Sequence, residues 1–129
     1  MRDDLKQAAK HDDCPVDKLL NKISGPWTTY ILWLLRQNDV LRFGEFRAQM
    51  PGISPKVLTE RLRRLEADGL VFREQRSTIP PQVFYSLTPR GEELKDILDR
   101  LGAVAQRWAA EDLARAQTSV ATAQASSRT

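Results

Sequence analysis

Five polar side chains recur at helical spacing between residues 54 and 69 and can all bond to the edges of DNA bases. They are Lys56, Thr59, Glu60, Arg63 and Arg64, and in a helix they point to roughly the same side. Lys and Arg can donate to guanine O6 and N7, the Thr methyl can contact thymine, and Glu can accept from cytosine. The spacing therefore predicts the reading face of a DNA recognition helix. The alternative without a binding role is the solvated charged face of an ordinary surface helix.

The other side of this stretch is apolar at the same spacing, through Leu58, Leu62 and Leu65. Ser54 precedes a proline and is expected to cap the first turn, where it can also meet DNA. Gly69 is expected to end the helix. One side of the helix is therefore predicted to enter a core, while the polar side stays free. Arg61 lies nearer the core edge and is expected to touch phosphate or pair with an acid.

Cys14 is the second residue with chemistry available to it. It precedes an expected helix, where the helix dipole and free N–H groups stabilise a thiolate that oxidants or electrophiles can attack. Asp12, Asp13 and Asp17 lie close in sequence and oppose thiolate formation. The alternative is a small buried cysteine whose sulfur is inert.

The basic residues are distributed unevenly along the chain. The 129 residues carry a net charge of +3. Segment 36–76 holds nine Lys and Arg against six Asp and Glu, an excess that equals the whole net charge. This local excess is the footprint expected of a face that binds duplex DNA.

The expected elements describe a mainly α-helical winged helix-turn-helix with a small β-hairpin wing. Helices are predicted at 15–23, 27–37, 43–50 and 55–68, with the second one apolar nearly all round and therefore central. Leu41-Arg42 is expected to be a stub of strand. The short helix from Phe43, the Pro51-Gly52 turn and the recognition helix make the helix-turn-helix.

The wing is predicted from two short strands, VFREQR and VFYSL, joined by a loop that contains Pro80-Pro81. Arg73 and Arg76 lie on the strand that enters the wing, and Ser77 and Thr78 at its tip. The two arginines are expected to contact phosphates or the minor groove rather than to read bases, and Ser77 and Thr78 are also expected to bind DNA.

A long helix is expected from Thr88-Pro89 to about residue 113 and is predicted to form a homodimer. Apolar residues recur there every three or four positions, the spacing of a coiled-coil seam. The predicted dimer contacts are Leu94, Ile97, Leu98, Leu101, Val104, Ala105 and Trp108. Residues 1–13 are expected to be a flexible arm, 14–113 one DNA-binding and dimerisation domain, and 114–129 a disordered tail.

Several short motifs in this order resemble the HxlR-type winged helix-turn-helix transcription regulators of bacteria and archaea, over about residues 14–108. They are Cys14-Pro15-Val16, Gly25-x-Trp27-Thr28, Arg42-Phe43-x-Glu45, Pro51-Gly52-Ile53-Ser54-Pro55-Lys56-x-Leu58-Thr59-x-Arg61-Leu62, Leu65-Glu66-x-Asp68-Gly69-Leu70, and Pro80-Pro81 followed by Tyr85-Ser86-Leu87-Thr88 and Gly91. The resemblance implies a dimeric DNA-binding regulator, and some members respond to electrophiles or oxidants through the cysteine before the first helix, which is Cys14 here. The basic segment and the predicted dimer together lead us to expect a pseudo-palindromic operator. Pro26 departs from the family, which often has lysine there, and so do Gln82 and Phe84 in the wing.

Other classes of function find little support in the residues. His11 and Cys14 have no further Cys or His to complete a transition-metal site, and no cofactor is expected. There is no His/Asp/Ser constellation or phosphate-binding glycine loop, so the chain is not expected to be an enzyme. A single cysteine, no membrane span and no signal peptide favour a cytoplasmic protein.

Two alternatives remain open. A winged-helix module could bind another protein through the same charged face, with a shallower salt dependence than DNA binding. A ligand pocket could be lined by the aromatic residues Trp27, Tyr30, Trp33 and Trp108, although such residues are more often core.

Overall fold

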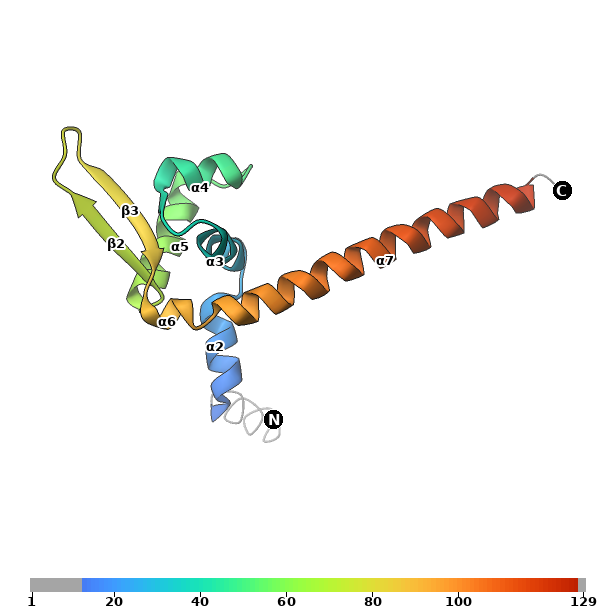
Figure 1. Cartoon of the computed structure of the whole chain (residues 1–129), viewed down its shortest axis with the longest axis horizontal. Helices are drawn as coiled ribbons and strands as arrows, with labels where there is room; N and C mark the ends of the chain where they lie inside the picture. Colours follow the sequence, from blue (N-terminus) through green and yellow to red (C-terminus); the bar gives the residue numbers. More distant parts are fainter. Residues whose placement is uncertain (1–12, 128–129) are drawn as a thin grey trace, which may run out of the picture. The chain divides into compact units, whose positions relative to one another are not determined.

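The structure is a computed structural model that describes residues 13–127. The chain divides between Glu93 and Leu94 into two compact units. The first unit contains α2 (Pro15–Ile23), α3 (Thr28–Gln37), α4 (Phe43–Gln49), α5 (Pro55–Ala67) and α6 (Pro89–Glu92), together with a three-stranded sheet (Figure 1). The second unit contains α7 (Lys95–Ser127). Most of the predicted N-terminal arm, including His11 and Asp12, lies outside the described residues.

Helix α3 is the buried centre of the first unit, as its apolar sequence predicts. Ile31, Leu32 and Leu35 expose 1% or less of their surface. The hydroxyl of Tyr30 donates to the backbone carbonyl of Gln49 at 2.8 Å and so ties α3 to the end of α4. The short helix α4 contributes Phe46, which is fully buried.

The turn between α4 and α5 has the geometry of a helix-turn-helix. Gly52 adopts a φ of +92°, a conformation that side chains rarely permit, and Ile53 N–H closes the turn on the carbonyl of Met50 at 3.2 Å. The Ser54 hydroxyl caps α5 by accepting from Val57 N–H at 3.1 Å. Beyond the last turn, Gly69 takes a φ of +77°. The predicted start and end of the recognition helix are confirmed.

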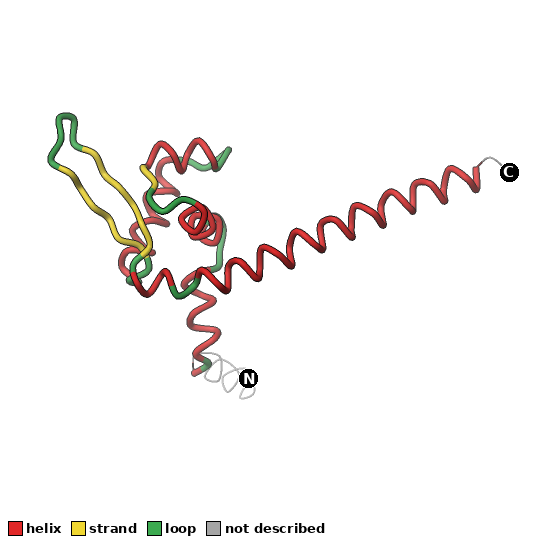
Figure 2. Tube along the Cα trace, viewed as in Figure 1, coloured by secondary structure: helices red, strands yellow, loops and turns green. Residues whose placement is uncertain are grey.

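The wing is part of a sheet in the order β1-β3-β2, formed by β1 (Leu41–Arg42), β2 (Val71–Arg76) and β3 (Gln82–Leu87) (Figure 2). All pairs are antiparallel, and Val71 lies opposite Leu87 while Arg76 lies opposite Gln82. The hairpin is therefore anchored at its base by buried Val71, Tyr85 and Leu87, and its far end is exposed.

Hydrogen bonds from Thr88 join the residues that follow α5 to the start of α6. Thr88 donates its N–H to the Leu70 carbonyl at 3.1 Å and its hydroxyl to the Gly69 carbonyl. The same hydroxyl accepts from Gly91 N–H at 3.0 Å. A side chain at position 91 would overlap the carbonyl of Leu70. Only glycine fits this close approach without a shift of the backbone.

The C-terminal helix differs from the prediction at both ends. The helix expected to start at Pro89 is interrupted at Glu93 and Leu94 and resumes at Lys95. At the other end α7 continues to Ser127, so the prediction of a disordered tail is wrong for residues 114–127. Seven alanines between 109 and 125 explain this continuation, since alanine has the highest helix propensity. Among the helices that the structure describes, none has the length and apolar character to cross a membrane.

Candidate nucleic-acid interface

The polar face of α5 is free to meet a ligand. Lys56, Glu60, Arg63 and Arg64 are all exposed, and Thr59 is half-buried. None of the four charged side chains forms a hydrogen bond or ion pair with any residue that the structure describes. Glu60 therefore makes no ion pair with the neighbouring Arg64. The face instead presents three cationic donors and one carboxylate acceptor to solvent.

The two hydroxyl groups of α5 differ in what they can offer. Ser54 accepts a hydrogen bond through its oxygen, which leaves its hydroxyl hydrogen available to donate outward. The Thr59 hydroxyl donates its hydrogen to the Pro55 carbonyl at 2.8 Å. Ser54 can thus donate to a phosphate oxygen, whereas Thr59 is left with its methyl group for an apolar contact such as a thymine methyl.

Arg61 is half-buried and serves the fold of the helix-turn-helix. Its Nε donates to the carbonyl of Pro26 at 3.0 Å, across 35 positions of sequence. Of the two expectations for Arg61, the described residues show no pairing with an acid, and contact with phosphate stays a prediction. The bond instead joins α5 to the turn between α2 and α3, where Gly25 and Trp27 both have positive φ values. The terminal guanidinium nitrogens keep further donors.

The two arginines of the wing are in different surroundings. Arg73 is exposed and forms no hydrogen bond or ion pair with any residue that the structure describes. Arg76 lies with its guanidinium carbon 4.1 Å from the ring centre of Phe84, and its Nε is 3.6 Å from a carboxylate oxygen of Glu74. Part of the charge of Arg76 is therefore already compensated. At the tip, Ser77 and Thr78 are exposed as predicted, but the Thr78 hydroxyl donates to the Pro80 carbonyl at 2.8 Å.

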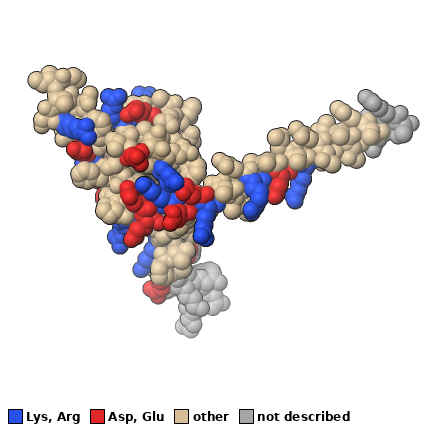
Figure 3. Space-filling view, in the orientation of Figure 1, with Lys and Arg blue, Asp and Glu red and all other residues tan. Residues whose placement is uncertain are grey.

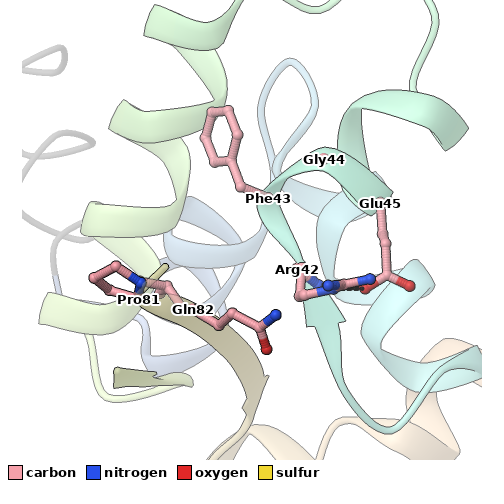
Figure 4. A pocket seen from close by; sticks show the side chains of 7 residues that line it. Arg42, Phe43, Gly44, Glu45, Pro81 and Gln82 are labelled. Atoms are coloured by element: carbon pink, nitrogen blue, oxygen red, sulfur yellow. Dashed lines mark hydrogen bonds and ion pairs between the residues drawn. The ribbon is translucent and has the colours of Figure 1, made fainter. Parts of the chain in front are cut away.

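An open groove of about 390 Å³ separates the start of α4 from the start of β3 (Figure 4). Arg42 and Glu45 lie on one side of it and Gln82 on the other. Glu45 accepts from Arg42 N–H at 2.9 Å and from its Nε at 3.2 Å. The backbone and side-chain bonds from Arg42 hold the pKa of Glu45 below its ordinary value. The remaining guanidinium donors of Arg42 can still bind an anion.

Cys14 stands at the N-cap of α2, as predicted. Its thiol is free and half-buried, and its side chain makes no capping hydrogen bond. Its carbonyl accepts from Lys18 N–H at 3.1 Å and closes the first helical turn. Asp17 lies in that first turn. A half-exposed thiol at this position is accessible to a small reagent.

The predicted dimer contacts on the C-terminal helix divide into two groups. Leu94 and Leu98 expose only 5% and 2% of their surface in the single chain. Ile97, Leu101 and Trp108 expose 47%, 54% and 58%. Val104 is half-buried and Ala105 exposed. The exposed part of the predicted dimer stripe therefore consists of Ile97, Leu101, Ala105 and Trp108.

A family model described as HxlR-like helix-turn-helix matches residues 22–113, most of the chain. The chain belongs to the HxlR-like helix-turn-helix family. Several relatives of this chain are named as HTH-type transcriptional regulators. One is the HTH-type transcriptional regulator YybR of Bacillus subtilis strain 168, which is 44% identical over 87 residues, covering 67% of this chain and 69% of YybR. The winged helix-turn-helix prediction and the family resemblance are both confirmed.

Two solved structures that are similar to this chain are those of the regulators HypR and YodB. The redox regulator HypR in its reduced form is 37% identical, covers 73% of this chain and 92% of its own, and superposes with a TM-score of 0.69. The diamide-treated YodB from B. subtilis is 28% identical, covers 73% of this chain and 93% of its own, with a TM-score of 0.61. Each shares the winged-helix architecture described above.

Sequence reasoning did not predict three features of this surface, which are the Arg61–Pro26 bond, the Arg42–Glu45 pair and the exposure of Ile79. The hydrogen bond of Arg61 to Pro26 spans residues far apart in the chain, and no local pattern signals it. Arg42 has a signal, since a glutamate follows three positions later as in a capping box. Ile79 carries the largest exposure among the apolar side chains, at 102%, and its place between polar residues and two prolines indicated a loop tip.

Proposed function

We propose that the protein binds a pseudo-palindromic operator as a homodimer, with one α5 helix in the major groove of each half-site. The observation that carries this proposal is the unpartnered polar face of a capped recognition helix in a chain of the HxlR-like family. A helix whose charged groups bond to nothing else keeps them available for base edges. Such a regulator acts where its DNA is, which for bacteria and archaea is the cytoplasm.

The residues of α5 are assigned roles by the donors that they keep. Lys56 and Arg63 donate to guanine, Glu60 accepts from cytosine, and Thr59 contacts a thymine methyl. Arg64 and the helix start at Ser54 bind phosphate. Arg73 binds phosphate from the wing, whereas Arg76 contributes less because Glu74 and Phe84 already engage it. Ser77 lies beside these groups at the tip and keeps a hydroxyl for a phosphate oxygen.

Dimerisation is assigned to α7. Most helical stability in proteins comes from packing of an apolar face, yet every described side chain from 105 to 125 is exposed in the single chain. Ile97, Leu101 and Trp108 supply apolar surface that a second copy would bury, and Val104 and Ala105 lie beside them. Residues 114–127 are helical, so the proposed dimerisation helix continues beyond residue 113.

Cys14 is proposed to make DNA binding responsive to oxidants or electrophiles. HypR is described as a redox regulator and YodB was treated with diamide, and both share this fold. Because the chain has one cysteine, a disulfide must join Cys14 to the same residue of a partner subunit or to a small thiol. The test compares operator affinity before and after diamide in wild type and Cys14→Ser. Unchanged affinity of the wild type, or equal loss in the variant, would contradict a sensing role.

The operator itself is found by selecting binding sites from random duplex DNA. Two recognition helices related by a two-fold axis should enrich two inverted half-sites whose centres lie about 10 base pairs apart, or a multiple of that. Enrichment of a single unrepeated site would contradict binding as a symmetric dimer. Absence of any enriched sequence would contradict sequence-specific recognition altogether and favour a protein partner for the same face.

A further inference from the structure

The tip of the wing carries an apolar side chain where a DNA-binding wing is expected to be basic. Ile79 is 102% exposed, which exceeds every other apolar residue on the described surface. The segment 77–84 contains no charged residue. In the space-filling view the end of the hairpin shows no Lys, Arg, Asp or Glu on the visible face (Figure 3). The tip therefore has no charged side chain of its own with which to bind a ligand.

The tip is also held in one shape. Thr78 N–H donates to the Arg76 carbonyl at 2.9 Å, and the Thr78 hydroxyl reaches over Ile79 to the Pro80 carbonyl at 2.8 Å. The two prolines that follow have fixed φ angles. Because the backbone on both sides of Ile79 is constrained, little conformational entropy is lost when its side chain is buried by a ligand.

The hairpin is long enough to reach a second groove of the duplex. Its strands have six residues each, which span about 20 Å at roughly 3.3 Å per residue. Successive major and minor grooves lie about half a helical turn apart, roughly 17 Å along the axis. When α5 occupies the major groove, a wing of this length reaches the flanking minor groove.

The cations nearest the tip do not extend beyond it. Arg76 lies back over the ring of Phe84 and beside Glu74, and Arg73 is three residues closer to the core. Ile79 is therefore the most exposed apolar side chain at the tip, and the residues beside it there are uncharged. Apolar side chains in the minor groove pack on deoxyribose walls and base edges, as they do in proteins that insert Ile or Leu between base steps.

From these observations we propose that Ile79 is a specificity-determining contact, which packs in the minor groove beside each half-site and favours A·T pairs there. The reason for the preference is steric: guanine places an amino group on the floor of the minor groove, and A·T pairs do not. This inference rests on the proposed function, because it needs α5 in the adjacent major groove. A protein that docks on the same tip is the alternative outcome of the test.

The test uses the full-length protein and the selected operator. Ile79→Ala should weaken binding about tenfold, because most of an isoleucine side chain loses its burial. The slope of affinity against salt should stay that of wild type, whereas Arg73→Ala should reduce this slope by about one phosphate contact. Replacing flanking adenines by 2,6-diaminopurine adds the minor-groove amino group and leaves the major-groove edge intact. It should weaken wild type roughly fivefold and Ile79→Ala less than twofold.

Val40→Ala is the matched control, because Val40 is 47% exposed and lies outside the wing. It should bind both duplexes like wild type. Equal affinity of Ile79→Ala and wild type on the unmodified operator would overturn the inference, as would equal sensitivity of the two proteins to diaminopurine. Failure of the proposed function is seen separately, as a wild-type protein that does not prefer the operator over random duplex.

Discussion

The substitution Arg63→Ala separates base reading from general attraction to DNA. Arg63 is exposed on α5 and bonds to no described residue, so its removal leaves the fold intact. If its guanidinium donates to guanine O6 and N7, the loss is about 1–3 kcal/mol. At a factor of ten per 1.4 kcal/mol, this corresponds to operator binding weaker by roughly 5- to 150-fold. Binding to random duplex should fall by a much smaller factor, so the specificity ratio should drop.

The assay is a titration of labelled operator and random duplex at several salt concentrations. Arg107→Ala provides the control, because Arg107 is an exposed arginine of α7 that pairs with Glu111 at 3.9 Å, outside the helix-turn-helix. It should leave the specificity ratio unchanged. If Arg63→Ala weakens operator and random duplex by the same factor, Arg63 contacts phosphate and the proposed reading face is misassigned.

Three further predictions concern the fold and the assembly. Gly91→Ala should destabilise the protein by about 1–3 kcal/mol in urea unfolding, because its methyl group would overlap the Leu70 carbonyl; an unchanged unfolding midpoint would refute this packing. Leu101→Lys with Trp108→Lys should sediment as a monomer, since both side chains are more than half exposed in one chain; a persistent dimer would move the interface elsewhere. Glu45→Gln should lower stability at neutral pH, because the bonds from Arg42 stabilise the ionised Glu45 and hold its pKa below the ordinary value. The difference from wild type should disappear as the pH falls through this lowered pKa, since the contribution of Glu45 is present above the ordinary glutamate pKa and lost when the carboxylate is protonated.

Local chemistry made the helix-turn-helix and wing predictable. The cap at Ser54, the turn at Gly52 and the end at Gly69 each rest on a residue whose type is required by the backbone there. Apolar spacing then fixed which side of α5 is buried, because Leu58 and Leu62 can enter a core only together. These signals lie within a few residues of one another and are readable without tertiary information.

The long C-terminal helix was harder to predict for two physical reasons. Apolar spacing cannot say whether Leu94 and Leu98 are buried within one chain or between two, and the structure buries them in one. The segment after residue 113 has no core pattern, yet its alanines favour a helix through backbone propensity alone. Long-range contacts such as Arg61 to Pro26 leave no trace in the spacing of residues.

The ratio of affinities for operator and random duplex tests the central claim most directly. It is measured with the full-length protein and the operator selected from random DNA, at about 0.15 M salt, where phosphate contacts alone give little discrimination. The account predicts that the operator binds at least about a thousandfold more tightly. Equal affinity for the two duplexes would contradict the assignment of α5 as a DNA-reading helix.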